Sequence, residues 1–432
     1  MSRAPLFNRG FLSLFATQFF EAAGDNIIKG ALLFAVAVGG PWHDRIGDGG
    51  QGLVSFLFTV PFVFLSAFGG RLADRYSKRS STVALKTASI VVAIVTLFGF
   101  WGDSLGLSLV ALALFAIVSS FFGPVKYGMI AELVDRDEIV RANGVINVGT
   151  NLAVISGTII AGAVATAFSK AHAPEAEGTF TQTSGLLAPG ITMLAFSLLG
   201  WLTCLTLPKL VAQSPDLPLD ANPFTTYWDS LSQMAKGPLI VITLFWTFFY
   251  FLAAMVLAML ADYPQILGVS ALKASALSAA MGIAIGVGCV AAAWLSGKRS
   301  RLEFVPLGAA GLALAFLLLG LAPKNYWLIG ALLSAMGLAA GFYIIPLQAS
   351  LQELSPSSER GRFIGTANAM SFVMGGLGSL LFFGLSKVGM PSNRMFLPLA
   401  GLTVIAGVLV YLWLRRGSGR DGPSRSITLP AP

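Results

Sequence analysis

Residues 70–79 read GRLADRYSKR and place five charged side chains within ten positions. An apolar run lies on each side of this segment, over residues 51–70 and 81–101. A helix needs about 20 apolar residues, at a rise of 1.5 Å each, to cross the hydrocarbon core of a bilayer. The three segments together therefore predict two membrane-spanning helices joined by a short charged loop.

The composition of the whole chain agrees with this local pattern. Its 432 residues are 55% hydrophobic and 11% charged, and the mean hydropathy is +0.77. Soluble domains carry about 25% charged residues, so these values exclude a soluble globular chain, a disordered chain and a fibrous repeat. The apolar runs are too long for the strands of a membrane barrel. The fold class that we expect is therefore an all-α membrane protein.

The same pattern recurs along the chain and predicts twelve membrane-spanning helices. They are expected near residues 11–38, 51–70, 81–101, 105–127, 138–168, 186–207, 238–261, 274–296, 304–322, 327–347, 360–387 and 394–414. A polar linker with three prolines, Pro215, Pro218 and Pro223, separates the sixth run from the seventh. We predict a six-helix half over 1–208, a cytoplasmic linker over 209–237, a second half over 238–416 and a disordered tail over 417–432. Within the linker, residues 227–234 form either a short interfacial helix or a plain loop.

Basic residues predict the orientation of the helices. The formal charge is +8, and the pI of about 9.6 is explained by topology rather than by a nucleic-acid partner, because Lys and Arg collect in cytoplasmic loops. Both termini are expected to be cytoplasmic. That orientation gives the cytoplasmic side Arg3, Arg9, Arg71, Arg75, Lys78, Arg79, Lys86, Arg136, Arg141, Lys209, Lys236, Lys298, Arg299, Arg301, Arg360, Arg362, Arg415, Arg416, Arg420 and Arg425. It gives the external side only Arg45, Lys170, Lys273, Lys324, Lys387 and Arg394, with Lys29 and Lys126 inside spans.

The two halves also repeat each other in sequence. A shift of 221 positions matches Glu132 with Glu353, Glu138 with Glu359, Arg141 with Arg362 and Asn147 with Asn368. The matches fall at the same junction of each half, between its fourth and fifth spans. Parallel repeats of six spans are a transporter architecture with the substrate site between the halves.

The charged segment at residues 70–79 resembles the loop signature of the major facilitator superfamily. The signature has a glycine, three further residues, an Asp-Arg pair and a closing basic pair; Ser77 replaces its usual second glycine. The resemblance implies that Gly70 allows close helix approach and that Asp74 faces the amino end of another helix, where the dipole favours an anion. The gating residues that it implies are Gly70, Asp74, Arg75, Lys78, Arg79, Arg141 and Arg362. The alternative is that these charges only fix the topology.

Further stretches resemble the lysophospholipid transporter branch of that superfamily. They are QFFEAAGDNIIK at 18–29, FGPVKYG at 122–128, LSGK at 295–298, VPLG at 305–308, PLQ at 346–348 and ERGR at 359–362. The nearest pattern is the transporter domain that some bacteria fuse to an acyltransferase. Other members carry an Arg in the seventh span, whereas this chain has none between Pro238 and Ala261.

The resemblance implies a function as well as a fold. It implies a flippase that moves lysophospholipids from the outer to the inner leaflet of the bacterial inner membrane by alternating access.

 Re-acylation would fall to a separate acyltransferase on the cytoplasmic side. The transporter itself is expected to be a monomer without a cofactor, surrounded by membrane lipids.

The first span carries ionisable residues on one helix face. Glu21, Asp25 and Lys29 are spaced by four residues, which stacks them along the helix. A charge at the centre of a bilayer costs roughly 3 kcal/mol or more, so it must face the bundle interior or water. Asp25 and Lys29 can pair with each other. The pattern predicts either a substrate site for a polar headgroup or a structural ion pair.

Other polar and aromatic positions have two interpretations each. Asn143, Asn147 and Asn151 repeat every four residues and serve either helix packing or a site. Lys126 either extends to the interface or binds a lipid phosphate. Trp246 and Tyr250 line an acyl tunnel or face lipid. The candidate substrate-binding residues are Glu21, Asp25, Asn26, Lys29, Lys126, Asn147, Asn151, Tyr250, Gln348 and Asn368.

Two other functions compete with the lysophospholipid transporter. The first is a secondary transporter of a soluble solute or drug, coupled to protons through Glu21 or Asp25. The second is a lipid acyltransferase, since His43 and Asp48 have the spacing of an acyltransferase dyad. A short external loop lacks the support that a catalytic base needs, so we expect no enzyme activity. Cys204 and Cys289 suggest neither a disulfide framework nor a metal site.

Overall fold

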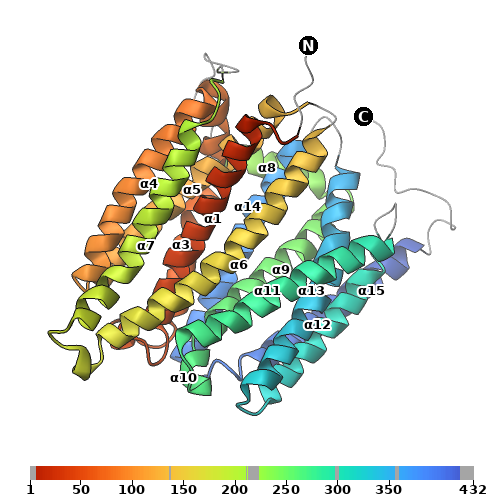
Figure 1. Ribbon diagram of the computed structural model, residues 1–432. Coiled ribbons are helices and arrows are strands. Elements are labelled where there is room, and N and C mark those ends of the chain that lie inside the picture. The colour runs from red at the N-terminus through yellow and green to blue at the C-terminus, as the bar shows by residue number, and fades with distance from the viewer. Residues whose placement is uncertain are drawn as a thin grey trace. The chain divides into compact units, whose positions relative to one another are not determined.

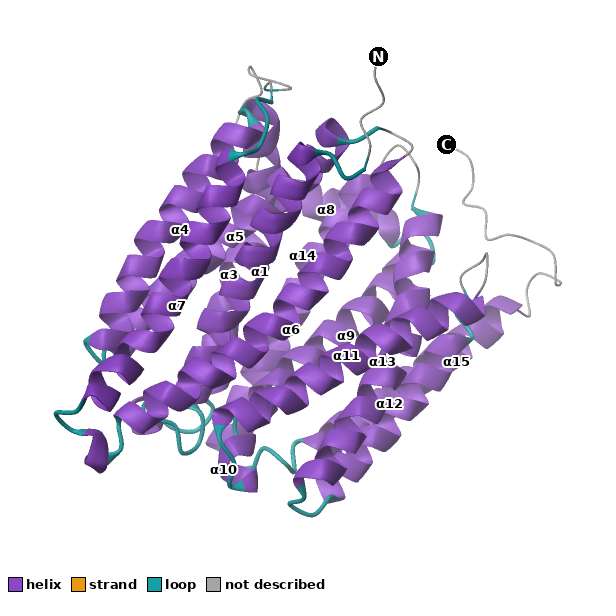
Figure 2. Cartoon of the chain, viewed as in Figure 1, coloured by secondary structure: helices purple, strands orange, loops and turns teal. Residues whose placement is uncertain are grey.

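The computed structural model consists of helices and turns, without a strand, over the residues it describes, which are 6–135, 138–210, 212, 223–296, 301–355 and 360–418 (Figure 2). The long helices are α1 (Arg9–Val36), α3 (Gly50–Arg75), α4 (Lys78–Trp101), α5 (Leu105–Leu133), α6 (Ile139–Ala171), α7 (Phe180–Leu205), α9 (Leu239–Leu260), α11 (Ala271–Ser296), α12 (Phe304–Leu321), α13 (Tyr326–Leu354), α14 (Arg360–Lys387) and α15 (Phe396–Ser418). The short ones are α2 (His43–Ile46), η2 (Pro174–Ala176), α8 (Pro223–Met234) and α10 (Tyr263–Leu267).

Most of the long helices have the length and the apolar composition of a membrane span. Within the described residues, ten helices are long and apolar enough to cross a bilayer. These ten do not include α1, whose Glu21, Asp25 and Lys29 lower its apolar character. The all-α membrane architecture expected from the composition is confirmed. Each predicted span overlaps one long helix, and α8 provides a helix where the linker pattern left a helix or a loop open.

The first of two structural units contains Met1–Pro223 and Leu260–Ala279. In this unit α1 packs against α3, α5, α6 and α7, while α4 packs against α5 and α7. The pair of α4 and α7 lies side by side along its length (Figure 1). Close approach of α1 and α6 depends on Gly157, where a Cβ atom would lie 2.6 Å from the main-chain oxygen of Ala23. Trp42 closes one end of the core against Phe100 and Phe168, with ring centroids 5.1 and 4.9 Å away.

The segment Leu260–Ala279 joins this first unit through polar contacts. The buried carboxylate of Asp262 accepts hydrogen bonds from the main-chain N–H of Val38, at 2.9 Å, and from Gln51. Thr166 Oγ1 on α6 accepts a hydrogen bond of 3.0 Å from the main-chain N–H of Leu272 at the start of α11. The chain therefore leaves the first unit after α7, and residues 260–279 pack with that unit again.

The second unit contains Phe224–Met259 and Ala280–Pro432. Its α12 packs against α13 and α15, and its α11 crosses α13 where glycines replace larger side chains. A Cβ atom on Gly341 would collide with the main chain of Gly288 and Cys289. Tyr343 on α13 is 1% exposed and donates a hydrogen bond of 2.9 Å to the main-chain oxygen of Phe245 on α9. Close main-chain packing thus connects the helices of this unit.

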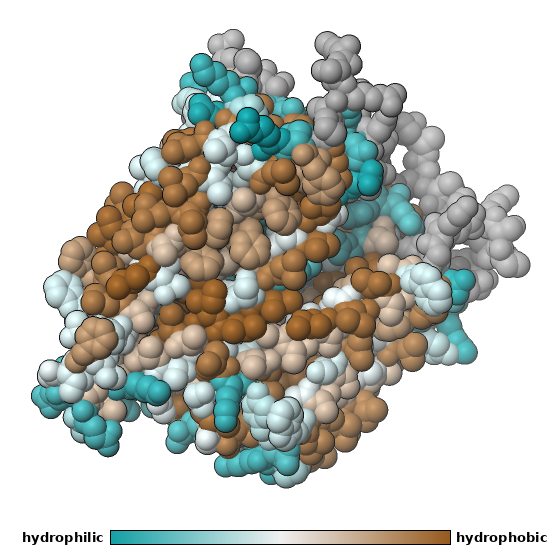
Figure 3. Space-filling model, in the orientation of Figure 1, coloured by the Kyte–Doolittle hydropathy of each residue, from teal (hydrophilic) through white to brown (hydrophobic). Residues whose placement is uncertain are grey.

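Large apolar side chains are exposed along the outer faces of the helices. On α4 they include Val91, Phe98 and Trp101, and on α7 they include Ile191 and Leu202. Figure 3 shows apolar side chains over the sides of the helices on the visible face and hydrophilic side chains near helix ends. Such continuous apolar surface matches contact with lipid rather than with water.

Candidate functional site

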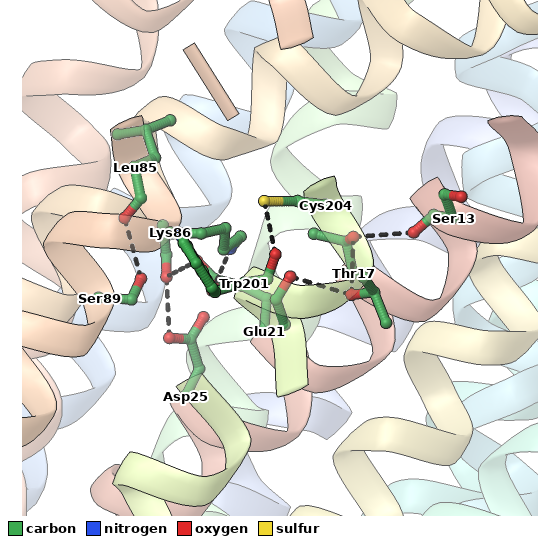
Figure 4. Close-up of polar contacts among 12 residues, drawn as sticks. Ser13, Thr17, Glu21, Asp25, Leu85, Lys86, Ser89, Trp201 and Cys204 are labelled. Carbon is green, nitrogen blue, oxygen red and sulfur yellow. Dashed lines mark hydrogen bonds and ion pairs between the residues drawn. The ribbon is translucent and has the colours of Figure 1, made fainter. Parts of the chain in front are cut away.

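One face of α1 is polar along several turns. Ser13, Thr17, Glu21 and Asp25 follow one another at intervals of four residues, which places them on the same side of the helix (Figure 4). The hydroxyl of Ser13 lies 2.7 Å from that of Thr206, and the hydroxyl of Thr17 lies 3.0 Å from that of Thr203. These contacts fix the rotation of α1 against the end of α7, so that Glu21 and Asp25 face the interior of the unit.

Glu21 forms an ion pair with Lys86 of α4. The side chains are 9% and 1% exposed, respectively, so the pair is buried. The assignment of Lys86 to the cytoplasmic side stays a prediction, and its side chain is buried within the unit. Lys86 lies in the third turn of α4, where the carboxylate of Glu21 compensates its charge. The sequence carries a signal for this position, since the buried residues Lys78, Thr82 and Lys86 recur every four residues on α4.

Asp25 is bonded to α5 rather than to its neighbour on α1. Ser119 Oγ lies 2.8 Å from Asp25 Oδ1 and 3.1 Å from Glu21 Oε1. Lys29 instead lies over the ring of Phe58, with its Nζ 5.2 Å from the ring centroid. Among the described residues Asp25 and Lys29 form no ion pair, so the pairing that their spacing allowed is not adopted. Residues one helical turn apart can form an ion pair. Here each of the two side chains contacts a residue on another helix instead.

Lys126 on α5 completes the group of charges. Its side chain is buried at 8% exposure, and its Nζ lies 4.6 Å from the ring centroid of Tyr127. The positive charges of Lys86 and Lys126 both act on Asp25. We call Glu21, Asp25, Lys86, Ser119 and Lys126 the charged cluster. It brings two carboxylates and two ammonium groups together from three helices, which is the electrostatic pattern that a zwitterion would complement.

A cavity borders the charged cluster within the first unit. It is small, with a volume of about 10 Å³, which is room for about one water molecule, and it lies among α1, α4, α5 and α7. The polar part of its lining comes from Glu21, Asp25 and Lys86, and an apolar part comes from Phe115 and Phe196. The cavity therefore combines charged groups with an apolar wall, as binding sites for small molecules do.

The remaining site candidates of the first unit are less tightly connected. The side-chain amide of Asn26 donates a hydrogen bond of 2.8 Å to the main-chain oxygen of Ala22 on its own helix. Asn147 and Asn151 on α6 are exposed, and they are not part of the cavity lining. The structure therefore brings Glu21, Asp25 and Lys126 together and leaves these three asparagines outside that group.

Three candidates belong to the second unit. Tyr250 on α9 packs edge-on against Trp246, with centroids 5.0 Å apart. Gln348 on α13 is half-buried, and Asn368 on α14 is exposed. Their assignment to a substrate site stays a prediction.

The charged loop after α3 is held by contacts to other helices of its unit. Lys78, at 3% side-chain exposure, pairs with Glu132 at the end of α5. Gly128 makes room for it, since a Cβ there would lie 2.6 Å from Lys78 Cε. Arg79 donates a hydrogen bond of 3.3 Å to the main-chain oxygen of Leu205 at the end of α7. The loop thus ties α4 to both α5 and α7.

The other gating candidates are described only in part. The guanidinium of Arg75 lies 5.7 Å from the ring centroid of Tyr76, and Arg141 pairs with Glu138 at 3.1 Å. The side chains of Asp74 and Arg362 lie outside the described residues, although both positions are helical. The gating assignment therefore stays a prediction.

Polar residues also gather at the loops beside Trp42. The carboxylate of Asp103 accepts hydrogen bonds from Trp42, Arg45 and His172. Partial burial raises the pKa of Asp103, but these hydrogen bonds outweigh it, and the pKa lies below its usual value. Nearby, His43 Nε2 lies 3.5 Å from Asp48 Oδ1. That distance is longer than the hydrogen bond that an orienting carboxylate makes to a catalytic histidine.

Curated relatives of this chain cover nearly its whole length. The lysophospholipid transporter LplT of Photorhabdus laumondii subsp. laumondii is 25% identical over 431 residues, which are 95% of this chain and 97% of the relative. The LplT of Cronobacter sakazakii is 27% identical over 437 residues, with 95% and 97% covered. The chain is therefore similar to these transporters from end to end.

Solved structures resemble the fold. A crystal structure of the nucleoside transporter NupG superposes with a TM-score of 0.70 at 13% identity and covers 94% of this chain and 99% of that one. A bacterial homologue of the human lysosomal transporter Spinster gives 0.70 at 15% identity, with 97% and 100% covered. The sequence profile of the Major Facilitator Superfamily matches residues 14–379, and a second match covers 301–430. The chain belongs to the Major Facilitator Superfamily.

Proposed function

We propose that this protein transports lysophospholipids. The observation that carries the proposal is the similarity to LplT transporters over 95% of the chain. The charged cluster and its cavity add a physical reason. Moving a charged headgroup through hydrocarbon is the barrier to flipping, and buried groups of both signs lower that barrier.

The roles that we assign follow from the chemistry of the substrate. The phosphate of a lysophospholipid is attracted to Lys86 and Lys126, and a cationic headgroup is attracted to Glu21 and Asp25. The phenylalanines of the cavity wall contact apolar parts of the substrate. Transport then proceeds by alternating access from the outer to the inner leaflet, with Asp74 and its charged loop controlling the conformational change.

We further propose twelve membrane spans with both termini in the cytoplasm of a bacterium, in its inner membrane. The protein acts as a monomer, and a separate acyltransferase consumes the delivered lysophospholipid. The orientation can be tested with single cysteines in a background that lacks Cys204 and Cys289. A cysteine at Glu177 should react with an impermeant reagent from outside intact cells, and one at Asp229 should not. Labelling of Asp229 from outside would contradict the orientation.

The transport activity can be tested with purified protein in liposomes. A lysophospholipid with a fluorescent acyl chain is added to the outer leaflet, and albumin then extracts whatever remains there. Protein-containing vesicles should protect a growing fraction of the lipid, whereas protein-free vesicles should not. A matched diacyl phospholipid serves as a control for general scrambling. Equal protection with and without protein would contradict the proposal.

The competing functions give different outcomes in the same vesicles. A transporter of a soluble solute would take up solutes and leave lysophospholipid extractable. An acyltransferase would convert the lysophospholipid chemically when an acyl donor is present, which chromatography of the extracted lipid would detect. His43→Ala should leave lipid transport unchanged if, as we propose, the protein is not an enzyme.

A further inference from the structure

The hydroxyl of Ser119 lies between two carboxyl groups. Its Oγ is 2.8 Å from Asp25 Oδ1 and 3.1 Å from Glu21 Oε1, so both contacts have the length of a hydrogen bond. A serine hydroxyl carries one hydrogen, and an ionised carboxylate can only accept. If Glu21 and Asp25 were both ionised, the two contacts would have to share the single hydroxyl hydrogen. One additional proton gives each contact a hydrogen of its own.

The ion pair of Glu21 indicates where this proton lies. Glu21 contacts Lys86 through Oε2 and Ser119 through Oε1, so both of its oxygens have positively polarised partners. Asp25 has no ion pair among the described residues, and its contact is the Ser119 hydroxyl. The arrangement that satisfies each atom has Asp25 donating to Ser119 Oγ, and Ser119 donating to the ionised Glu21.

We propose that Glu21, Ser119 and Asp25 form a proton-binding site, with the bound proton on Asp25. Loss of this proton would place two negative charges around one hydroxyl in a buried site, which is costly. The charged residues that face the site are Lys86 on α4, Lys126 on α5 and Lys29 on α1. The helix α7 has no Asp, Glu, Lys or Arg, and Cys204 is its ionisable residue. The charged residues of α3 fall within its last two turns, and those of α6 within its end turns.

A small cavity lies beside the site. Glu21, Asp25 and Lys86 all contribute to its lining. The ammonium of Lys86 has three N–H donors; it pairs with Glu21, and its Nζ lies 3.9 Å from the ring centroid of Phe122. Within the described residues this buried nitrogen has no hydrogen-bond acceptor beyond the ion pair.

The ligand is a proton rather than a metal cation. Two ammonium groups, Lys86 and Lys126, lie close enough to act on Asp25, and they would repel a second cation. A proton instead adds the hydrogen that the contacts of Ser119 lack. The proposal does not depend on which solute the protein carries, so it can fail or hold independently of the function proposed above.

Infrared spectroscopy of the purified protein in lipid nanodiscs tests the proposal. A protonated carboxylic acid has a C=O stretch that an ionised carboxylate lacks, and this band shifts in D₂O. We expect the band at neutral pH in the wild type and its loss in Asp25→Asn. Removal of the hydroxyl in Ser119→Ala should shift the band. Ser120→Ala is the matched control, because the Ser120 hydroxyl donates to the main-chain oxygen of Ile117 and should leave the band unchanged.

The outcomes separate clearly. A band that persists unchanged in Asp25→Asn, or a wild-type spectrum without a protonated carboxylic acid, would overturn the proposal. If Asp25→Asn does not fold, the two serine variants decide. A shift in Ser119→Ala without a shift in Ser120→Ala supports the site, and identical spectra of the two variants overturn it.

Discussion

The first long helix of each structural unit, α1 in the first and α9 in the second, shows a contrast in chemistry. Helix α1 carries Glu21, Asp25 and Lys29 within its length, whereas α9 has no charged residue from Leu239 to Leu260. Around α1, ion pairs and hydroxyl contacts connect neighbouring helices. Around α13 of the second unit, the connections are close glycine contacts and a tyrosine hydrogen bond. The two structural units therefore use different interactions between their helices.

The difference indicates where chemistry takes place in this protein. Buried charges are costly in a membrane and persist where they bind a ligand or a proton. Glycine contacts allow helices to approach closely without any polar group. We therefore expect substitutions in the first unit to alter transport together with stability, and substitutions in the second unit to alter stability through packing.

The largest effect is expected from Glu21→Ala, which leaves Lys86 buried without its partner. Breaking a buried ion pair from one side costs about 3–5 kcal/mol. The double variant Glu21→Ala with Lys86→Ala removes both charges and should recover much of this loss. Thermal unfolding in detergent measures the stability, and vesicle transport measures the activity. If the double variant is no more stable than Glu21→Ala, the unpaired charge of Lys86 is not the cause of the lost stability.

The second-largest effect is expected from a change in the packing of the second unit. In Gly341→Ala the added Cβ atom meets the main chain of Gly288 and Cys289. Overpacking of this kind costs about 1–3 kcal/mol, and we expect a corresponding decrease in the midpoint of thermal unfolding.

Gly401→Ala is the control for this packing test, because nothing lies within 4 Å of a Cβ at that position. It should be neutral or slightly stabilising, since alanine favours a helix over glycine. Equal unfolding midpoints for the two variants would contradict close packing of α11 on α13.

A smaller effect is expected where hydroxyl groups join α1 to α7. Thr17→Val removes the contact with Thr203, and interhelical hydrogen bonds in membranes average about 0.6 kcal/mol. A double-mutant cycle with Thr203→Val isolates this interaction. Thr403→Val in the second unit is the control, since within the described residues the Thr403 hydroxyl donates to the main-chain oxygen of Leu399 on its own helix. A coupling energy of zero would show that this hydroxyl contact does not help to orient α1.

The smallest effect concerns Asp103 in the loops beside Trp42. Its pKa is lower in the folded protein than its usual value, so it stabilises the fold above its unfolded pKa of about 3.9. This contribution is lost as the pH falls through the lower, folded pKa. Asp103→Asn should therefore reduce stability at neutral pH, and the difference from wild type should shrink below about pH 4. Thermal unfolding of both proteins across that pH range measures this. A stability difference between wild type and Asp103→Asn that increases as the pH falls would contradict the lowered pKa of Asp103.

Local patterns in the sequence predicted a large part of this molecule. Apolar runs of helical length placed every long helix, and the charged segment at 70–79 placed the turn between α3 and α4. The spacing of Glu21 and Asp25 predicted one polar face on α1, which the structure contains. These features depend on residues within a few turns of one another, so a single segment contains the information.

The partners of the charges required the tertiary structure. The spacing on α1 allowed Asp25 to pair with Lys29, but Asp25 contacts Ser119, which is 94 residues away. Lys86 was predicted within a span without any partner, and it pairs with Glu21 inside the unit. Hydropathy along one segment determines that a helix enters the membrane, because transfer from water depends on the segment itself. Which side chains meet depends on the rotation of each helix against its neighbours, and that rotation is set by contacts distributed over the whole unit.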